Sequence, residues 1–447
     1  MNKMYQKRIV WIGFLIVFLL LIPVLLSQAM GYKYNWHKHR FEATGILFVK
    51  TYPKDVDIIL DDELIDTKTP SQLAKILPGI YNLKISKNNY LPWEKNIVIN
   101  EHSTTFVEDV VLFSRSLPSP IGKFELIDYL TNNSNEYILL SKHNGKTNII
   151  SYNTNDHTTK ILKEWDNPIN IQLLSLSPNN EKLIYSENSA YKLLLINSPF
   201  IDEQLTGLSK SYWQDIAWDA TNDNIIYSQI GSTLSEINIS TLPVSITATT
   251  RNIIDFFTHE SKVYFLTRSE EGNQVILHQA ERKFTNVEQL ILLPYTTALR
   301  YIPSNGMLSL LDPTNNFLYL IDTAQSDIIV KVYPNVSNAK WYDVNYDKIL
   351  YWNSNEISVY FKDREQSQLI TRLGDPIKDT WWHPNGAYIF YQQADKIHII
   401  EFDERDKKNN YEIVTLDNDS FFTVNSKGDE IIYYSTHQQT LYKQVIQ

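Results

Sequence analysis

The side chains that most often carry out catalysis are few and scattered in this chain of 447 residues. It contains no cysteine, which excludes thiolate nucleophiles, thiolate-bound metals and disulfides. Its ten histidines form no His-Glu-x-x-His motif, and no Gly-x-Ser-x-Gly turn or phosphate-cradling Gly-x-x-x-x-Gly-Lys loop is present. We therefore predict a protein that is not an enzyme, and we name no catalytic, cofactor-binding or metal-binding residue and no cofactor.

Two histidines close in sequence are the first candidate for a metal site. His37 and His39 stand beside Lys38 and Arg40, shortly after a long apolar segment. A pair of imidazoles can bind a transition metal. A basic strip that meets anionic lipid headgroups is the favoured interpretation.

A group of acidic residues is the second candidate. Asp55, Asp57, Asp61, Asp62 and Glu63 offer clustered oxygen ligands of the kind that calcium takes. They do not form an Asp-x-Asp-x-Asp-Gly loop. We interpret them as the solvated tip of a hairpin.

The tripeptide Trp381-Trp382-His383 is the third candidate, because aromatic rings can stack on a sugar. Trp382, however, occupies the same phase of the repeat described below as Trp218 and Leu176. We therefore expect Trp382 in a core and leave the role of Trp381 open.

The net charge of -10 is unevenly distributed. Residues 1–116 carry about +3 and the remainder about -13. Neutralising a phosphate backbone needs clustered lysine and arginine, so the acidic C-terminal part argues against nucleic acid as a partner.

The N-terminal segment predicts a membrane anchor over residues 9–32. No charge occurs from Ile9 to Tyr32, and the apolar run Ile9–Leu26 is long enough as a helix to cross about 30 Å of hydrocarbon. The positive charges on the two sides are equal in number, Lys3, Lys7 and Arg8 against Lys33, Lys38 and Arg40. A short basic tail before a first apolar segment still favours a tail of residues 1–8 in the cytoplasm and everything after residue 32 outside it. The alternative is a secretory signal peptide cleaved near Ser27-Gln28-Ala29.

Residues 43–116 predict a small β-domain. Short apolar runs with β-branched residues alternate with turn residues, which is typical of strands. The expected strands are Gly45–Lys50, Val56–Leu60, Ile80–Ile85, Asn96–Ile99 and Phe106–Leu112.

The order of motifs in this segment resembles the PEGA domain. The motifs are Gly45, Pro53, Asp61-Asp62, Thr69-Pro70, Leu77-Pro78-Gly79-Ile80-Tyr81 and Asn89-Tyr90-Leu91-Pro92-Trp93. The tetrapeptide that names the family is replaced here by Pro53-Lys54-Asp55-Val56, which suggests a differently shaped turn. The resemblance implies a small β-sandwich and no chemistry.

Residues 117–447 contain a repeat with an average spacing of 42 residues. In most copies an apolar or aromatic strand end is followed nine positions later by the core of a second strand. The pairs are Leu130 and Leu139, Leu176 and Tyr185, Trp218 and Tyr227, Phe257 and Tyr264, Tyr301 and Leu310, Trp341 and Tyr351, Trp382 and Tyr391, and Val424 and Tyr433.

This period predicts a β-propeller of four-stranded blades, eight in number or alternatively seven. The last copy ends early, so we expect its outer strand to come from Phe124–Ile127 and to close the ring. The turns Leu176-Ser177-Pro178-Asn179 and Trp382-His383-Pro384-Asn385-Gly386 resemble the WD40-like repeat of TolB-type propellers. This resemblance implies a fold more than a family.

The fold class expected is therefore all-β, with an N-terminal transmembrane helix, a PEGA-like β-sandwich and a propeller. We predict a membrane-tethered extracytoplasmic protein of the cell envelope whose propeller binds or scaffolds an envelope protein or a cell-wall glycan. The alternative is an envelope hydrolase or lyase with a composite active site on a propeller face. A signalling role is less favoured, because a tail of about eight residues can hardly carry an output domain.

Overall fold

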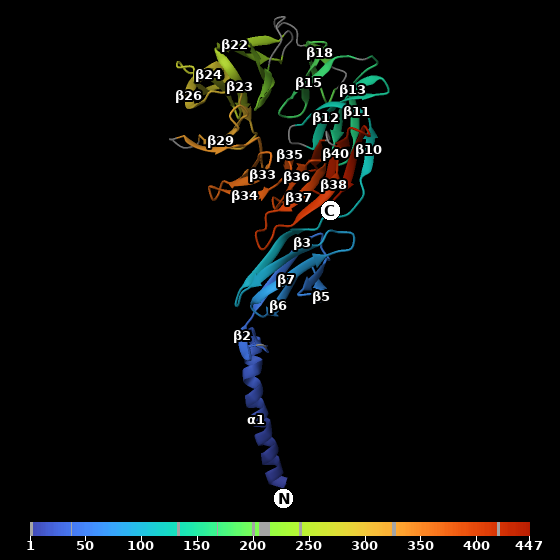
Figure 1. Ribbon diagram of the computed structural model, residues 1–447, viewed down its shortest axis with the longest axis vertical. Coiled ribbons are helices and arrows are strands. Elements are labelled where there is room, and N and C mark those ends of the chain that lie inside the picture. The colour runs from blue at the N-terminus through green and yellow to red at the C-terminus, as the bar shows by residue number, and fades with distance from the viewer. Residues whose placement is uncertain are drawn as a thin grey trace. The chain divides into compact units, whose positions relative to one another are not determined.

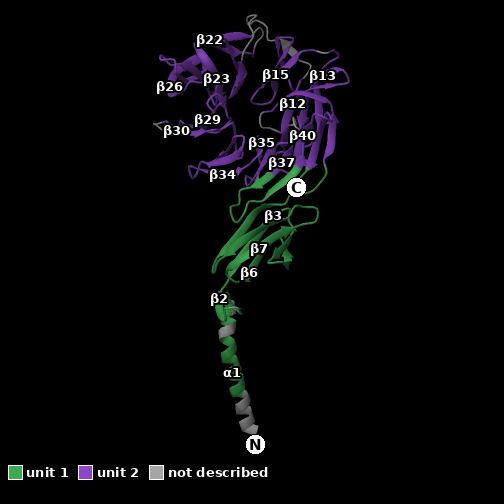
Figure 2. Cartoon of the chain, viewed as in Figure 1, with its two compact units in different colours: residues 1–117, 399–413, 445–447 green, residues 118–398, 414–444 purple. Residues whose placement is uncertain are grey.

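The computed structural model describes the chain except for residues 1–2, 37, 132–134, 168, 199–201, 205–214, 241–243, 324–327 and 418–420. The described part is mainly β-structure, with one long helix. It divides into two compact units (Figure 2). Unit 1 comprises Met1–Leu117, Ile399–Ile413 and Val445–Gln447, and unit 2 comprises Pro118–His398 and Val414–Gln444.

Unit 1 begins with a helix and a short hairpin. Helix α1 covers Lys3–Ala29, and its described side chains from Trp11 to Leu21 are exposed. Among the residues that the structure describes, no helix is both long and apolar enough to cross a membrane. Strands β1 (Tyr32–Asn35) and β2 (Arg40–Ala43) pair in antiparallel fashion after the helix.

The rest of the N-terminal segment forms two facing sheets. One has the order β6-β3-β9 and the other β5-β4-β7-β8. The strands are β3 (Gly45–Tyr52), β4 (Asp57–Leu60), β5 (Glu63–Lys68), β6 (Ser71–Ile76), β7 (Gly79–Ser86), β8 (Trp93–Ile99) and β9 (Thr104–Val111). The five predicted strands are all present, whereas β5 and β6 were missed because their burial pattern is mostly exposed.

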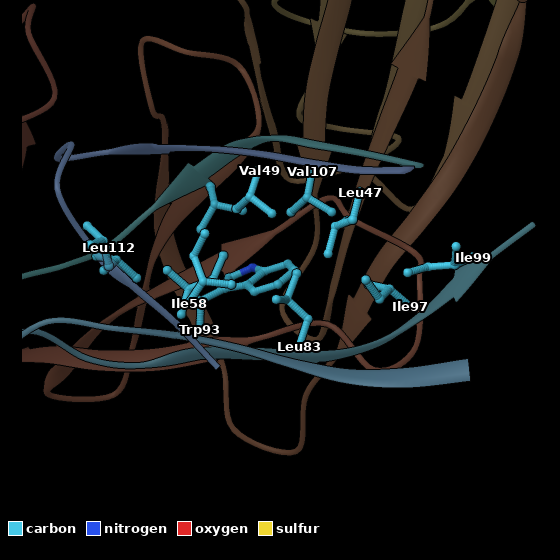
Figure 3. Close-up of a cluster of buried hydrophobic side chains, with 12 residues drawn as sticks. Leu47, Val49, Ile58, Leu83, Trp93, Ile97, Ile99, Val107 and Leu112 are labelled. Atoms are coloured by element: carbon cyan, nitrogen blue, oxygen red, sulfur yellow. The ribbon is translucent and has the colours of Figure 1, made fainter. Parts of the chain in front are cut away.

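The core of this sandwich comes from alternate positions of both sheets (Figure 3). In β8 the burial alternates without a break, so that Trp93, Ile97 and Ile99 face inward. They meet Leu47 and Val107 from the opposite sheet. This period of two is what makes one face of each sheet apolar and fixes its register.

Gly45 is expected to be intolerant of any larger side chain. A Cβ at this position would lie 2.3 Å from the carbonyl oxygen of Asn100 and 2.6 Å from Ile99 Cγ2. Because the first of these atoms belongs to the backbone, we expect Gly45→Ala to destabilise the sandwich by about 1–3 kcal/mol. Hydrogen exchange of β3 and β8 measures this effect. The control is Gly374→Ala, where nothing lies within 4 Å, and equal protection in the two variants would contradict the prediction.

The remaining strands form eight four-stranded sheets within the described residues of 119–445 (Figure 1). In chain order the sheets are β11 (Glu125–Leu130), β12 (Glu136–His143), β13 (Lys146–Asn153) and β14 (Thr159–Trp165); β15 (Ile171–Leu176), β16 (Lys182–Glu187), β17 (Ala190–Leu195) and β18 (Asp202–Gln204); β19 (Asp215–Asp219), β20 (Asn222–Ile230), β21 (Thr233–Asn238) and β22 (Ser245–Arg251); β23 (Ile253–His259), β24 (Lys262–Arg268), β25 (Gln274–Glu281) and β26 (Thr285–Pro294); β27 (Arg300–Tyr301), β28 (Met307–Asp312), β29 (Phe317–Asp322) and β30 (Ile329–Pro334); β31 (Asn338–Trp341), β32 (Lys348–Trp352), β33 (Glu356–Phe361) and β34 (Gln366–Arg372); β35 (Ile377–Trp382), β36 (Tyr388–Gln393), β37 (Lys396–Glu401) and β38 (Asn410–Thr415); and β39 (Phe422–Val424), β40 (Glu430–Ser435), β41 (Thr440–Val445) and β10 (Ser119–Lys123).

The sequence repeat coincides with these sheets. The first residue of every predicted pair lies at or near the end of a first strand, such as Leu130 in β11 and Trp382 in β35. The second residue lies in the adjacent strand, such as Leu139 in β12 and Tyr391 in β36. Side chains from successive sheets pack together in shared cores, which is how sheets stacked around a ring bury their faces.

The first and last sheets of the series also pack together. Tyr137 and Leu139 share a core with Ile432, Tyr434 and Leu441. The last sheet takes its outer strand from the N-terminal side, because β10 pairs with β41. That strand was expected at 124–127, but it lies a few residues earlier, and β11 instead begins the first sheet.

Candidate functional site

The first strands of successive sheets are neighbours, and we call them the inner strands. Contacts join β11 to β15, β15 to β19 and β19 to β23. Further along, the backbone N–H of Leu299 donates to Asp255 Oδ2 at 2.6 Å. Arg300 in β27 donates to Asn338 in β31, and Lys340 in β31 reaches Asp379 in β35.

One group of these residues carries the charges expected of a binding site. It consists of Arg300, Asn338, Lys340, Asp379 and Trp381, and we call it the inner-strand cluster. All five residues belong to unit 2. The side chains of Lys340 and Asp379 are 26% and 34% exposed, so both residues are half-buried.

Lys340 is held by two acceptors and one aromatic ring. Its Nζ donates to Asp379 Oδ1 at 2.9 Å and to the carbonyl oxygen of Thr380 at 2.8 Å. The same atom lies 3.6 Å from the centroid of a Trp381 ring, close enough for a cation–π interaction. Burial lowers the pKa of Lys340, and the charge of Asp379 acts in the opposite direction.

Asp379 is the carboxylate at the centre of the cluster. Besides Lys340, it accepts hydrogen bonds from the N–H of Thr380 at 2.8 Å and from Trp381 Nε1 at 3.1 Å. Its charge also opposes the lowering of the pKa of Arg300, which burial causes. Two cations therefore share the field of a single carboxylate.

Tyr129, an aromatic residue of the first sheet, lies within the electrostatic reach of Asp379. Burial raises the pKa of Tyr129, and the charges of Asp379 and Asp128 add to the effect. The Tyr129 ring is 40% exposed and stacks on Phe421 with 4.6 Å between the centroids. Accessible rings beside fixed charges are typical of ligand sites rather than of cores.

The three residues 381–383 have different environments. Trp382 is 9% exposed and donates through Nε1 to the carbonyl oxygen of Lys340 at 2.9 Å, in agreement with the predicted core position. His383 is 3% exposed and stacks on Phe390. Trp381 alone is half-buried and belongs to the cluster.

The acidic residues considered for calcium lie in and near the turn between β4 and β5. Asp61 and Asp62 have positive φ values of 49° and 65°. Asp61 Oδ1 accepts the N–H of Asn82 at 2.8 Å, and Asp57 pairs with Lys68 at 3.1 Å. Within the described ranges, no three histidine or acidic side chains are grouped as a metal would require.

The basic strip near the helix is partly neutralised. Lys38 and Arg40 both pair with Glu42, at 3.1 Å and 2.6 Å. Hydrogen bonds from Asn35 and then Arg40 lower the pKa of Glu42 to about 2. His39 lies in the turn of this hairpin with a positive φ of 50°, and His37 lies outside the described residues.

Unit 1 contains a second polar cluster, which is fully buried. Lys95 has 0% and Glu401 has 2% side-chain exposure, and their charged atoms are 2.8 Å apart. Glu401 also accepts from Trp93 Nε1 at 2.7 Å and from the N–H of Asn409 at 2.6 Å. Burial raises the pKa of Glu401, although the hydrogen bond from Lys95 opposes this.

The segment Ile399–Ile413 surrounds this buried pair within unit 1. Lys95 Nζ donates to the carbonyl oxygen of Asp403 at 2.6 Å. Arg405 joins the Asp403 carboxylate at 2.6 Å and donates to the carbonyl oxygen of Phe106, also at 2.6 Å. These groups saturate one another, so this second cluster has a structural role.

Sequence reasoning did not find the inner-strand cluster apart from Trp381. The three charged residues of the cluster lie one to three residues before a strand end that the repeat identifies. They are Arg300, Lys340 and Asp379. Collecting the charged residues at that phase in all copies would have grouped them. The phase alone does not say which neighbours touch, because bulges shift the register between Ile377 and Asp379.

Comparison with known proteins supports both parts of the fold. Residues 44–110 match the family model of the PEGA domain. No curated protein matches the chain.

Solved structures resemble the chain at the level of the fold. The C-terminal WD40 domain of Sif2 has a TM-score of 0.50 at 11% identity, covering 74% of this chain and 99% of that one. A structure described as the eukaryotic initiation factor also has a TM-score of 0.50 at 11% identity, covering 72% and 88%. This chain thus contains a PEGA domain at residues 44–110 and, C-terminal to it, a β-propeller-type fold.

Proposed function

We propose that this protein is an extracytoplasmic binding or scaffolding module, tethered to the membrane by its N-terminal helix. In this proposal each of the eight four-stranded sheets is one blade of a closed ring. The ring binds an envelope component through the inner-strand cluster. The protein is not an enzyme in this proposal.

The inner-strand cluster is the observation that carries the proposal. It combines two cations, one carboxylate and an accessible indole on adjacent strands. Such a set can orient a polar ligand by hydrogen bonds and pack against its apolar parts. It supports binding, since no side chain in it is a nucleophile aligned with a general base.

The membrane tether rests on the sequence. The run Ile9–Leu26 is apolar in the sequence, and the side chains from Trp11 to Leu21 are exposed on helix α1. A helix that is apolar on every face is typical of a membrane span or of the interior of a large protein. The exposed rings Trp36 and Phe41 after the helix are suited to the membrane interface.

The test uses the full chain. We expect the protein to stay in the membrane fraction after a carbonate wash. After transfer to lipid nanodiscs, we expect it to bind envelope material without cleaving it. Mass spectrometry and sugar analysis identify that material, with empty nanodiscs as the control. Recovery of the protein in the carbonate wash would refute the tether, and no retention would refute the binding role. Shortened glycan or peptide in the flow-through would favour a hydrolase or lyase.

A further inference from the structure

Among the charged residues of the inner-strand cluster, Arg300 has the fewest partners within the described part of the protein. A guanidinium has five N–H donors. Among the described residues, Arg300 donates through Nη2 to Asn338 and has no carboxylate within ion-pair distance. Its side chain is exposed, and it extends from an inner strand. A cation in such a position can take an external anion in the forked geometry that suits a carboxylate.

Lys340 adds a second positive charge. Two of the three N–H donors of its ammonium have acceptors within the described part of the chain, and the ring of Trp381 lies 3.6 Å from the same nitrogen. Lys340 and Arg300 lie close enough for each charge to act on the other. A second positive charge near Arg300 strengthens the attraction for one anionic group.

Asp379 provides a hydrogen-bond acceptor beside the two cations. Its Oδ2 accepts one hydrogen bond, from Trp381. A carboxylate oxygen can accept more than one hydrogen bond, so Asp379 can also accept from a hydroxyl donor. The half-buried ring of Trp381 adds a flat apolar surface.

We propose that the inner-strand cluster binds a saccharide that carries a carboxylate. Arg300 binds the carboxylate and Lys340 adds a second positive charge nearby. Asp379 accepts a hydroxyl group, and the ring of Trp381 covers the apolar face of a sugar ring. This inference rests on the proposed binding function and adds the class of ligand.

An acidic peptide fits this site less well. It offers carboxylates but few hydroxyl donors, so Asp379 would repel it without gaining a partner. The region after residue 116 carries about -13, which also disfavours a ligand with several closely spaced negative charges. One carboxylate among several hydroxyl groups matches the observed donors and acceptors.

The experiment measures binding of three probes to the full chain in nanodiscs by calorimetry. The probes are a hexuronic acid tetrasaccharide, the same saccharide with its carboxyl groups reduced to alcohols, and a tetraglutamate peptide. We expect the acidic saccharide to bind at least tenfold more tightly than either of the others. We expect its affinity to fall about tenfold or more in Arg300→Gln and to fall at high salt.

Two further variants separate binding from folding. Arg300→Lys keeps the charge but loses the fork, so its affinity is expected between those of the parent and Arg300→Gln. Arg364→Gln is the matched control, because Arg364 is an exposed arginine of unit 2 outside the cluster, and its affinity is expected to be unchanged.

Each alternative outcome overturns a stated part of the inference. If the reduced saccharide binds as tightly as the acidic one, the carboxylate is not recognised. If tetraglutamate binds as tightly, the ligand is an acidic peptide instead. If the affinity of Arg300→Gln for the acidic saccharide is unchanged, the inner-strand cluster is not the binding site. If no probe binds while the same nanodiscs still retain envelope material, the ligand class is wrong and the proposed binding function stands.

Discussion

Replacing Glu401 by alanine lowers the free energy of unfolding of unit 1 by about 3–5 kcal/mol, the usual cost of leaving a buried charge without its partner. The remaining ammonium of Lys95 has 0% exposure and keeps only the more distant carboxylate of Asp403, at 3.7 Å. Trp93 Nε1 and the N–H of Asn409 lose their acceptor at the same time. Hydrogen exchange of β7 and β8, followed by mass spectrometry, measures the effect on unit 1 separately from unit 2.

Two comparisons test the physical cause of this loss. Glu108→Ala removes an exposed carboxylate of the same unit and is expected to change stability by less than about 0.5 kcal/mol. The double variant Lys95→Met, Glu401→Leu replaces the ion pair by apolar groups and is expected to recover most of the loss. If Glu401→Ala exchanges at the rate of the parent protein, the buried pair does not stabilise unit 1.

Acidification from pH 7 to pH 4 is expected to remove about 3 kcal/mol of stability from unit 2 through His383 alone. Burial lowers the pKa of this histidine to about 4, and the hydrogen bonds of Asn385 and Gly428 only partly oppose the effect. The unfolded chain takes up the proton near pH 6.5, whereas the folded chain does so near pH 4. The unfolded state therefore binds more protons in this window, and stability falls as the pH falls.

The surroundings of His383 explain why it stays neutral. The ring stacks on Phe390 and is packed so closely by Gly428 that a Cβ there would lie 2.8 Å from Nε2. In His383→Gln the stability of unit 2 is expected to depend less on pH, whereas His437→Gln, at an exposed position, is expected to retain the full dependence. Equal pH dependence in His383→Gln and the parent protein would contradict this assignment.

Much of the fold could be predicted from local patterns. The spacing between Leu139, Tyr185 and Tyr227 located the second strand of each sheet, because every sheet must bury the same positions. The alternation in β8 likewise identified a sandwich strand. Strands β5 and β6 escaped because a mostly exposed strand has no apolar period, and the closing strand was misplaced by a few residues because either neighbouring segment can extend a sheet edge.

The candidate site could be predicted only in part. The repeat phase predicted a core position for Trp382 but did not determine the role of Trp381. The two side chains differ in the structure because adjacent residues of a strand point to opposite faces. Its grouping with Lys340 and Arg300 depends on which sheets are neighbours and on the bulge beside Asp379. A period in the sequence carries no information about contacts between charges on different sheets.

The sequence by itself determined the class of structure, because strand periodicity and the 42-residue repeat are local properties that each segment carries alone. It also determined the PEGA domain, through turn residues at fixed positions. Only the tertiary structure decided that Lys95 finds Glu401 more than 300 positions later and that Arg300 and Lys340 face one carboxylate. Charges lose their hydration on burial wherever the fold places them, so their partners are set by three-dimensional proximity and not by spacing along the chain.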